Sequence, residues 1–140
     1  MRSIPALAVT TLFSLFVVAP ATAEPGYSID TVVNTFDEDD VEPTKVGYQY
    51  WFADTDFADG KTLKLSVVRP HAATHAPHAH EEDEFFFVLE GTAEFYLDGE
   101  TATGGPMTSF YCPSGVEHGI RNIGDTELKY LVIKQYIVDD

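Results

Sequence analysis

This chain has a single cysteine and few basic residues. Its single cysteine, Cys112, excludes an intramolecular disulfide, so stability has to come from a hydrophobic core. Only 8 residues are lysine or arginine against 23 aspartates and glutamates, which gives a formal net charge of −15. Such a surface repels phosphate backbones and anionic lipids, so we expect no nucleic-acid partner and no binding to anionic membranes. We attribute the acidic excess to solubility outside the cytoplasm.

Long apolar runs are also scarce, and the only one lies at the N-terminus. Arg2 precedes a charge-free, mostly apolar run over residues 4–18, and the small-x-small sequence Ala21-Thr22-Ala23 follows it. This pattern predicts a signal peptide over residues 1–23 that is cleaved after Ala23. The run is short for a membrane span, which disfavours an uncleaved anchor. We therefore expect a secreted or periplasmic protein with one domain over residues 24–140.

No segment has a convincing helical period, and short apolar-rich segments separated by turns fill the chain instead. The Asp98-Gly99 pair lies between two such segments and predicts a two-residue hairpin, because both positions tolerate positive φ. Many short strands in one small domain predict an all-β jelly-roll barrel. The predicted strands are residues 29–34, 46–52, 63–69, 84–90, 92–97, 108–112, 117–122 and 129–136.

The strongest chemical signal is a pair of histidine segments in the second half of the chain. Their sequences are His78-x-His80-x-x-x-Glu84 and Pro113-x-Gly115-x-x-His118-x-x-x-Asn122. Three imidazoles and one carboxylate suit a single borderline divalent metal ion such as Mn, Fe, Ni, Cu or Zn. The alternative is a barrel whose histidines only fill its interior. We predict one metal per chain, with the ligands His78, His80, Glu84 and His118.

The two segments resemble the signature motifs of the cupin superfamily, small β-barrels that hold one metal inside. These motifs are G-x5-H-x-H-x3,4-E-x6-G and G-x5-P-x-G-x-x-H-x-x-x-N, matched here over residues 78–91 and 113–122. Ala72 and Met107 stand in place of the two leading glycines, which affects turn geometry and leaves the ligand set complete. The resemblance covers residues 62–136. It implies a small single-domain (type-2) cupin with a double-stranded β-helix fold.

Strand alternation places the side chains beside the ligands. If Glu84 points inward, Phe86 and Val88 do so too, while Phe85, Phe87 and Leu89 point outward. That outward apolar face needs cover from the N-terminal strands or from a second subunit, so we expect a homodimer.

Alternation in the second segment separates Arg121 from the inward face. His118, Ile120 and Asn122 share one face of this strand, and Arg121 lies on the other, which makes Arg121 a poor substrate clamp. Asn122 is expected to shape the turn before Gly124 rather than to bind metal.

Several other features have an ordinary and a functional interpretation. His71 and His75 are expected to be exposed loop residues, although extra ligands or proton shuttles are an alternative. Cys112 fits a buried small hydrophobe, or else a reactive or interchain cysteine. Residues 54–60 only partly match a calcium loop, and residues 36–40 fit a solvated acidic loop.

Three histidines and one glutamate leave open coordination positions for substrate or dioxygen, as in catalytic metal sites. The resemblance implies functions among oxalate-degrading enzymes, dioxygenases, sugar or uronate isomerases, and lyases. We expect an exported metalloenzyme acting on a small oxygenated substrate, with dioxygenase or oxalate-type chemistry ahead of a non-redox isomerase or lyase. A nonenzymatic metal or small-ligand binding protein and a metal-free structural barrel stay open. Candidates for a separate catalytic acid or base are Tyr48, Tyr50, Tyr96, Tyr111 and Lys64.

Overall fold

A computed structural model describes residues 28–137 of the chain, and the predicted signal peptide over residues 1–23 lies outside the described residues. Internal contacts divide the chain into residues 1–32 and residues 33–140. The described part of the first unit contains one short helix, α1 (Ile29–Val32). No helix in the described part of the chain is long and apolar enough to cross a membrane.

Helix α1 shows that the strand predicted over residues 29–34 is wrong. The backbone nitrogens of Thr31 and Val32 each donate to the Ser28 carbonyl at 3.1 Å. The Thr31 hydroxyl in turn accepts from the Ser28 nitrogen at 2.8 Å. Such local side-chain bonds compete with strand formation, and here they outweigh the β preference of the isoleucine and valine.

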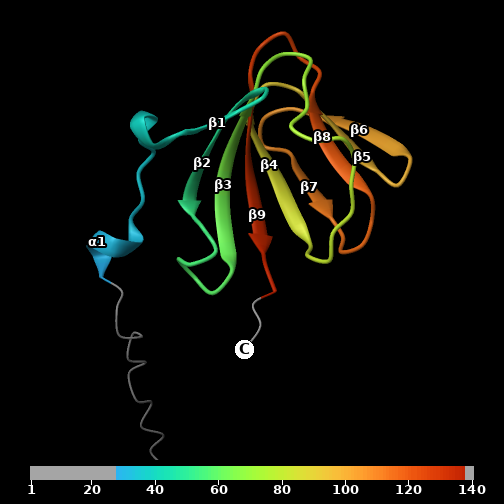
Figure 1. Cartoon of the computed structure of the whole chain (residues 1–140). Coiled ribbons are helices and arrows are strands. Elements are labelled where there is room, and N and C mark those ends of the chain that lie inside the picture. Colours follow the sequence, from blue (N-terminus) through green and yellow to red (C-terminus); the bar gives the residue numbers. More distant parts are fainter. Residues whose placement is uncertain (1–27, 138–140) are drawn as a thin grey trace, which may run out of the picture. The chain divides into compact units, whose positions relative to one another are not determined.

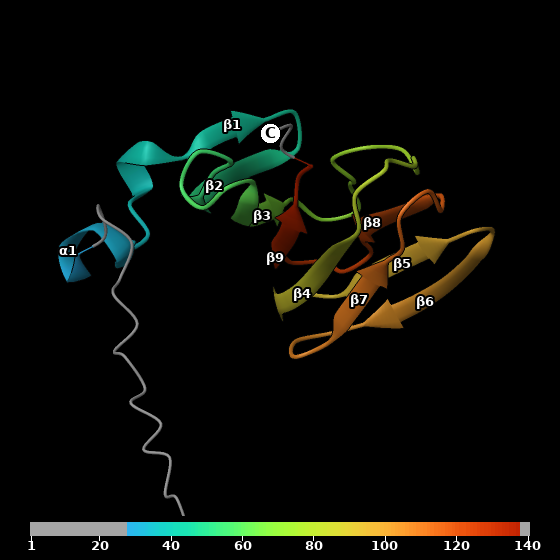
Figure 2. The same cartoon turned by 90° about the horizontal axis from the view of Figure 1, so that it is seen from below.

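The second unit is built almost entirely of antiparallel strands (Figure 1). One sheet has six strands in the order β1-β2-β3-β9-β4-β7, and the other has three in the order β6-β5-β8. Figure 2 shows the same strands from below. This arrangement confirms the predicted all-β jelly-roll barrel. The strands are β1 (Glu42–Thr44), β2 (Gly47–Ala53), β3 (Lys61–Val68), β4 (Glu84–Glu90), β5 (Ala93–Leu97), β6 (Glu100–Gly104), β7 (Ser109–Cys112), β8 (His118–Asn122) and β9 (Leu128–Gln135).

The sequence misses two strands, β1 and β6, and both lie at sheet edges. Neither contains a buried residue, because their outer surfaces meet solvent rather than a packed layer. Strand β1 also contains Pro43, which is tolerated at an edge but argues against a central strand. Edge strands of this kind lack the apolar alternation by which a strand is found in sequence.

The predicted Asp98-Gly99 hairpin is confirmed between β5 and β6. Both residues have positive φ, 44° and 89°, as a two-residue turn of the right twist requires. The flanking residues Leu97 and Glu100 pair directly. A 3-10 turn, η1 (Glu38–Asp40), lies within the acidic segment predicted to be a solvated loop, and its residues are exposed.

Apolar side chains from both sheets fill the barrel interior. Phe86 of β4 and Phe110 of β7 belong to the same buried cluster as Phe95 of β5 and Ile120 of β8. The Phe95 and Phe110 rings stack with their centroids 4.8 Å apart. The two sheets therefore face each other across one hydrophobic core.

A second cluster lies on the outer face of β2 and β3. Tyr50, Leu65 and Val67 are buried there, and Phe36 and Val41 from the segment before β2 pack against them. The N-terminal part of the second unit thus covers this portion of the sheet.

That cover does not reach the outer face of β4. Alternation is as predicted, since Glu84, Phe86 and Val88 are buried while Phe85 and Leu89 are 46% and 40% exposed. Tyr111 and Ile133 on the neighbouring strands are exposed as well. The homodimer expected from this face stays a prediction.

Candidate metal centre

The two histidine segments lie against each other at the mouth of the barrel interior. His78 and His118 form a two-way backbone bridge, with nitrogen-to-oxygen distances of 3.0 and 2.9 Å. The Gly115 nitrogen donates to the His80 carbonyl at 2.8 Å. A side chain at Gly119 would bring its Cβ to 3.3 Å from Pro77 Cα, so glycine allows the first segment to pack closely on β8. The backbone therefore fixes the positions of all three histidines.

Backbone carbonyls also fix the orientation of each imidazole. In His78, His80 and His118, Nδ1 contacts a carbonyl oxygen two residues away. A carbonyl can only accept, so each contact assigns a hydrogen to Nδ1 and leaves Nε2 as the nitrogen available to a metal. The carbonyls belong to Ala76, Glu82 and Val116, at 3.1, 2.7 and 2.8 Å respectively.

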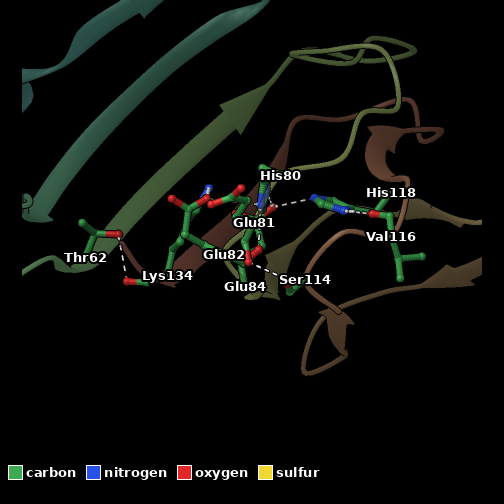
Figure 3. Close-up of polar contacts among 9 residues, drawn as sticks. All are labelled: Thr62, His80, Glu81, Glu82, Glu84, Ser114, Val116, His118 and Lys134. Carbon is green, nitrogen blue, oxygen red and sulfur yellow. Dashed lines mark hydrogen bonds and ion pairs between the residues drawn. The ribbon is translucent and has the colours of Figure 1, made fainter. Parts of the chain in front are cut away.

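Glu84 lies where the Nε2 atoms of two histidines converge (Figure 3). Its Oε1 is 3.1 Å from His118 Nε2 and 3.5 Å from His80 Nε2. Two ligand atoms that bind one metal at about 2.1 Å and at right angles lie about 3 Å apart. The observed separations are close to that value, so Glu84, His80 and His118 fit neighbouring coordination positions.

His78 completes a three-histidine group. One nitrogen from each of His78, His80 and His118 lies within 4.8 Å of the others. The ring centroids of His78 and His118 are 5.2 Å apart, and those of His80 and His118 are 4.7 Å apart. The three histidines could therefore hold a metal ion. The set of four ligands that includes Glu84 stays a prediction.

The donor set is chemically suited to a cation. An imidazole lone pair and a carboxylate oxygen repel each other at hydrogen-bond distance unless a proton or a metal ion lies between them. His118 is fully buried and Glu84 is 7% exposed, so solvent screens their contact little. A mixture of imidazole nitrogens and one carboxylate fits Mn, Fe, Ni, Cu or Zn and does not select among them.

Cys112 lies beside the histidine site, which the sequence did not indicate. It pairs with Glu84 across β4 and β7, and a second group of compatible ligand atoms joins Cys112 to Glu84 and His118. Burial raises the pKa of the Cys112 thiol to about 12, and the Glu84 charge acts in the same direction. The side chain is fully buried, as predicted, and has no exposed surface from which to form an interchain bridge.

A cavity of about 420 Å³ opens beside the histidines. Its size falls in the range of small-molecule sites. Phe86, Ile120 and Val132 supply apolar wall, while Lys64 and Lys134 bring two ammonium groups to it. The arrangement places the candidate metal site at the wall of a chamber of mixed polarity.

The structure separates the acid and base candidates by position. Tyr48 and Lys64 line the cavity. Tyr50 belongs to the outer cluster and donates to the Thr35 carbonyl at 2.9 Å. Tyr96 and Tyr111 donate to surface carboxylates outside the cavity lining.

Sequence reasoning missed Tyr130, which also lines the cavity. Its side chain is 3% exposed, and burial raises the pKa of its phenol. Inward alternation along β9 is a signal that would have found it, together with Lys134.

The remaining histidines differ from each other. His71 pairs with Asp125 at 3.0 Å on the surface and takes no part in the cavity lining. His75 is exposed but borders the cavity, and its ring centroid lies 5.7 Å from that of His78. Burial first, then the nearby His78 and Lys64, lower the pKa of His75.

Asn122 shapes a turn, as predicted. Its side-chain nitrogen donates to the carbonyls of Val68 at 2.9 Å and Thr126 at 2.7 Å. Its oxygen accepts from the Gly124 nitrogen at 2.9 Å. Arg121 lies on the opposite face of β8, exposed and paired with Glu94 at 2.7 Å.

In the acidic turn at residues 54–60, the first carboxylate accepts hydrogen bonds from the backbone. Asp54 Oδ1 accepts from the nitrogens of Asp56 and Phe57, each at 3.1 Å. Among the described residues, none from this turn belongs to a group with metal-ligand geometry. Asp54 therefore serves as the side-chain acceptor of this turn.

Comparison with known proteins identifies the family of the chain. Residues 64–134 match the model of the cupin domain. This chain belongs to the cupin family. Among curated proteins, the chain is similar to polyketide synthase CurC from Streptomyces cyaneus, at 31% identity over 67 residues. That match covers 48% of this cupin and 44% of the relative, so the chain spans less than half of the protein it resembles.

Solved structures share the fold of this cupin. A Cupin 2 conserved barrel domain protein from Salinispora arenicola has a TM-score of 0.62 at 18% identity, over 74% of this chain and 87% of that one. A predicted oxalate decarboxylase from Thermotoga maritima has a TM-score of 0.60 at 19% identity, over 64% and 80%. KdgF from Halomonas has a TM-score of 0.58 at 20% identity, over 76% and 87%. At these identities the likeness establishes the fold alone.

Proposed function

We propose that this cupin is a mononuclear metal-dependent enzyme acting on a small oxygenated molecule. The observation that carries the proposal is the convergence of imidazole Nε2 atoms beside Glu84 at the wall of a cavity. His78, His80 and His118 would hold the metal, with Glu84 as the anionic ligand. A divalent metal bound there supplies Lewis acidity that polarises a substrate oxygen.

The protein's own residues prepare the chamber for such a reaction. The carbonyl contacts at Nδ1 hold the imidazoles in one orientation. Phe86, Ile120 and Val132 restrict water on the apolar side, which strengthens electrostatic interactions at the site. Tyr48, Lys64 and Tyr130 line the cavity and are the candidates for moving a proton.

Dioxygenase or oxalate-type chemistry is the reaction class we favour. The Thermotoga maritima neighbour named as a predicted oxalate decarboxylase supports this choice within the shared fold. A non-redox isomerase or lyase on a sugar or uronate is the second candidate, as membership of the cupin family implies. A nonenzymatic metal or small-ligand binding protein is the third.

A panel of substrates tests the enzyme against the binding protein. The metal-loaded protein is offered oxalate, a catechol, a flavonol and an unsaturated uronate, with product formation and dioxygen uptake measured together. We expect turnover of at least one compound, lost in Glu84→Gln and kept in the matched surface variant Glu100→Gln. No turnover of any compound by the loaded protein would favour the binding protein instead.

We also propose export of the mature chain, on the strength of the N-terminal sequence. Intact mass and N-terminal sequencing of protein recovered from a host envelope fraction would show a chain that begins at Glu24. A mature protein that retains Met1 would contradict cleavage.

A further inference from the structure

The cavity has the opposite charge to the chain as a whole. The chain has 23 acidic against 8 basic residues, yet within residues 28–137 Lys45, Lys64 and Lys134 line the cavity with Glu84 as the only carboxylate. Glu84 faces the histidines and would be matched by a bound cation. What remains of the lining is cationic, which attracts and concentrates anions.

Two lysines of the cavity lining, Lys45 and Lys64, form no ion pair among the described residues, and of these Lys64 is half-buried while Lys45 is exposed. Lys64 lies on the inward face of β3, with its Nζ 4.9 Å from the centroid of the Trp51 ring. Burial lowers the pKa of Lys64, while the more distant Glu84 charge acts against that effect. An ammonium group held over a ring in a partly buried chamber is prepared to receive an anion.

Lys134 supplies a second cationic group, on the strand beside Glu84. It pairs with Glu84 across β4 and β9 and with Thr62 across β3 and β9. Its Nζ contacts Glu82 at 3.4 Å, and the side chain is only 10% exposed. Glu82 already offsets part of this charge, so Lys134 should contribute less to anion binding than Lys64.

We propose that the cavity selects substrates that carry a carboxylate group, with Lys64 as its main partner and Lys134 as a second cationic group. This inference rests on the proposed function of the site and narrows its substrate class to small organic acids. Another oxygen of the same molecule would face the histidines. A neutral ligand would leave the Lys64 ammonium without an ionic partner, which disfavours uncharged flavonols and catechols.

Pairs of acids and their amides test this selection directly. Malonate and glucuronate are titrated into the full-length mature protein by calorimetry, each beside its neutral counterpart, malonamide or glucuronamide. Metal-free and metal-loaded protein are measured separately at one salt concentration. Loss of a charge-assisted contact predicts that at least one acid binds about tenfold or more tightly than its amide.

Three variants assign the preference to Lys64. Lys64→Met keeps the length of the side chain without its charge and should lose the acid preference about tenfold. Lys64→Arg should keep most of it. Lys61→Met changes an exposed lysine of the same strand, outside the cavity lining, and should match the wild type. Metal content should be equal in all of these proteins.

The outcomes separate this proposal from the metal proposal. If the protein binds no metal, the acid preference and its loss in Lys64→Met are still measurable in the metal-free protein. Equal binding of acids and amides, or no binding of either acid, would overturn the selection for carboxylates. A full preference retained in both Lys64→Met and Lys134→Met would overturn it as well, and the second variant serves if the first does not fold.

Discussion

The interior of the barrel has two ends of different chemistry. At the site end, Thr62, Lys134, Glu84 and Cys112 are successive neighbours across four strands. At the packed end, Val68 pairs with Leu128, and both are almost completely buried beside Val88 and Ala93. The same strands therefore supply a polar row for a ligand and apolar rows for the core.

This difference shows which end of the barrel is available for binding and which end stabilises the fold. Polar groups at the site end are held by specific contacts, and among residues 28–137 no buried side-chain nitrogen or oxygen lacks a partner. The packed end needs no such contacts, because apolar burial stabilises it without direction. The polar row of side chains is therefore available for binding, and the apolar rows of the same sheet stabilise the fold.

The largest expected effect is on the reactivity of the Cys112 thiol. This reactivity tests whether a reagent in solvent can reach the site end of the barrel. The raised pKa of about 12, against an ordinary value of 9.0, leaves far less thiolate at pH 8. Three pKa units lower the thiolate population about a thousandfold. We expect iodoacetamide to label the unfolded protein about that much faster than the metal-free native protein at pH 8. Equal rates would show that this end is open.

Core truncation should affect stability most at the packed end. Leu128→Ala removes a fully buried side chain and should lower the free energy of unfolding by about 2–5 kcal/mol. The matched variant Leu89→Ala changes a leucine that is 40% exposed and should cost about 1 kcal/mol or less. Chemical denaturation of both proteins provides the measurement. Similar losses would remove the distinction between core and surface on these strands.

Turn strain beside the packed end offers a stabilising change. Met107 replaces a motif glycine, has φ of 67° and is 79% exposed. Met107→Gly should raise the free energy of unfolding by about 1 kcal/mol, because a methionine in the left-handed region is strained. Gly91→Ala is the opposite control, since its Cβ would lie 2.5 Å from the Glu127 carbonyl oxygen. A destabilised Met107→Gly protein would show that the strain is absent.

Removal of a charge from the site end gives the smallest expected change in stability. Lys64→Met eliminates a partly buried ammonium without an ion pair, so we expect metal-free protein to be unchanged or more stable by up to about 1 kcal/mol. Thermal unfolding beside Lys61→Met measures the difference. A clear loss of stability in Lys64→Met alone would mean that the lysine serves the fold rather than a ligand.

Sequence reasoning found the parts of the molecule in which local pattern and tertiary structure agree. The motif spacing singled out His78, His80 and His118, and the structure brings one nitrogen of each close to the others, while Glu84 contacts His80 and His118. Alternation along β4 was correct for the same reason.

The rest depends on information that is not local. The closeness of Cys112 and Lys134 to Glu84 follows from strand order and register, which one sequence does not reveal. Strands β1 and β6 lack apolar alternation because they form exposed edges. The sequence shows that Met107 stands where the motif has glycine. Only the structure shows that the backbone at Met107 has the positive φ that favours glycine.

Metal content tests the central claim most directly. The mature protein, purified without chelator or immobilised nickel, is subjected to elemental analysis beside His118→Ala and the matched surface variant His71→Ala. We predict about one Mn, Fe, Ni, Cu or Zn per chain in the wild type and in His71→Ala, lost in His118→Ala, because a single first-row divalent ion suits this donor set. No metal in any of the three after reconstitution, or full content in His118→Ala, would contradict the account.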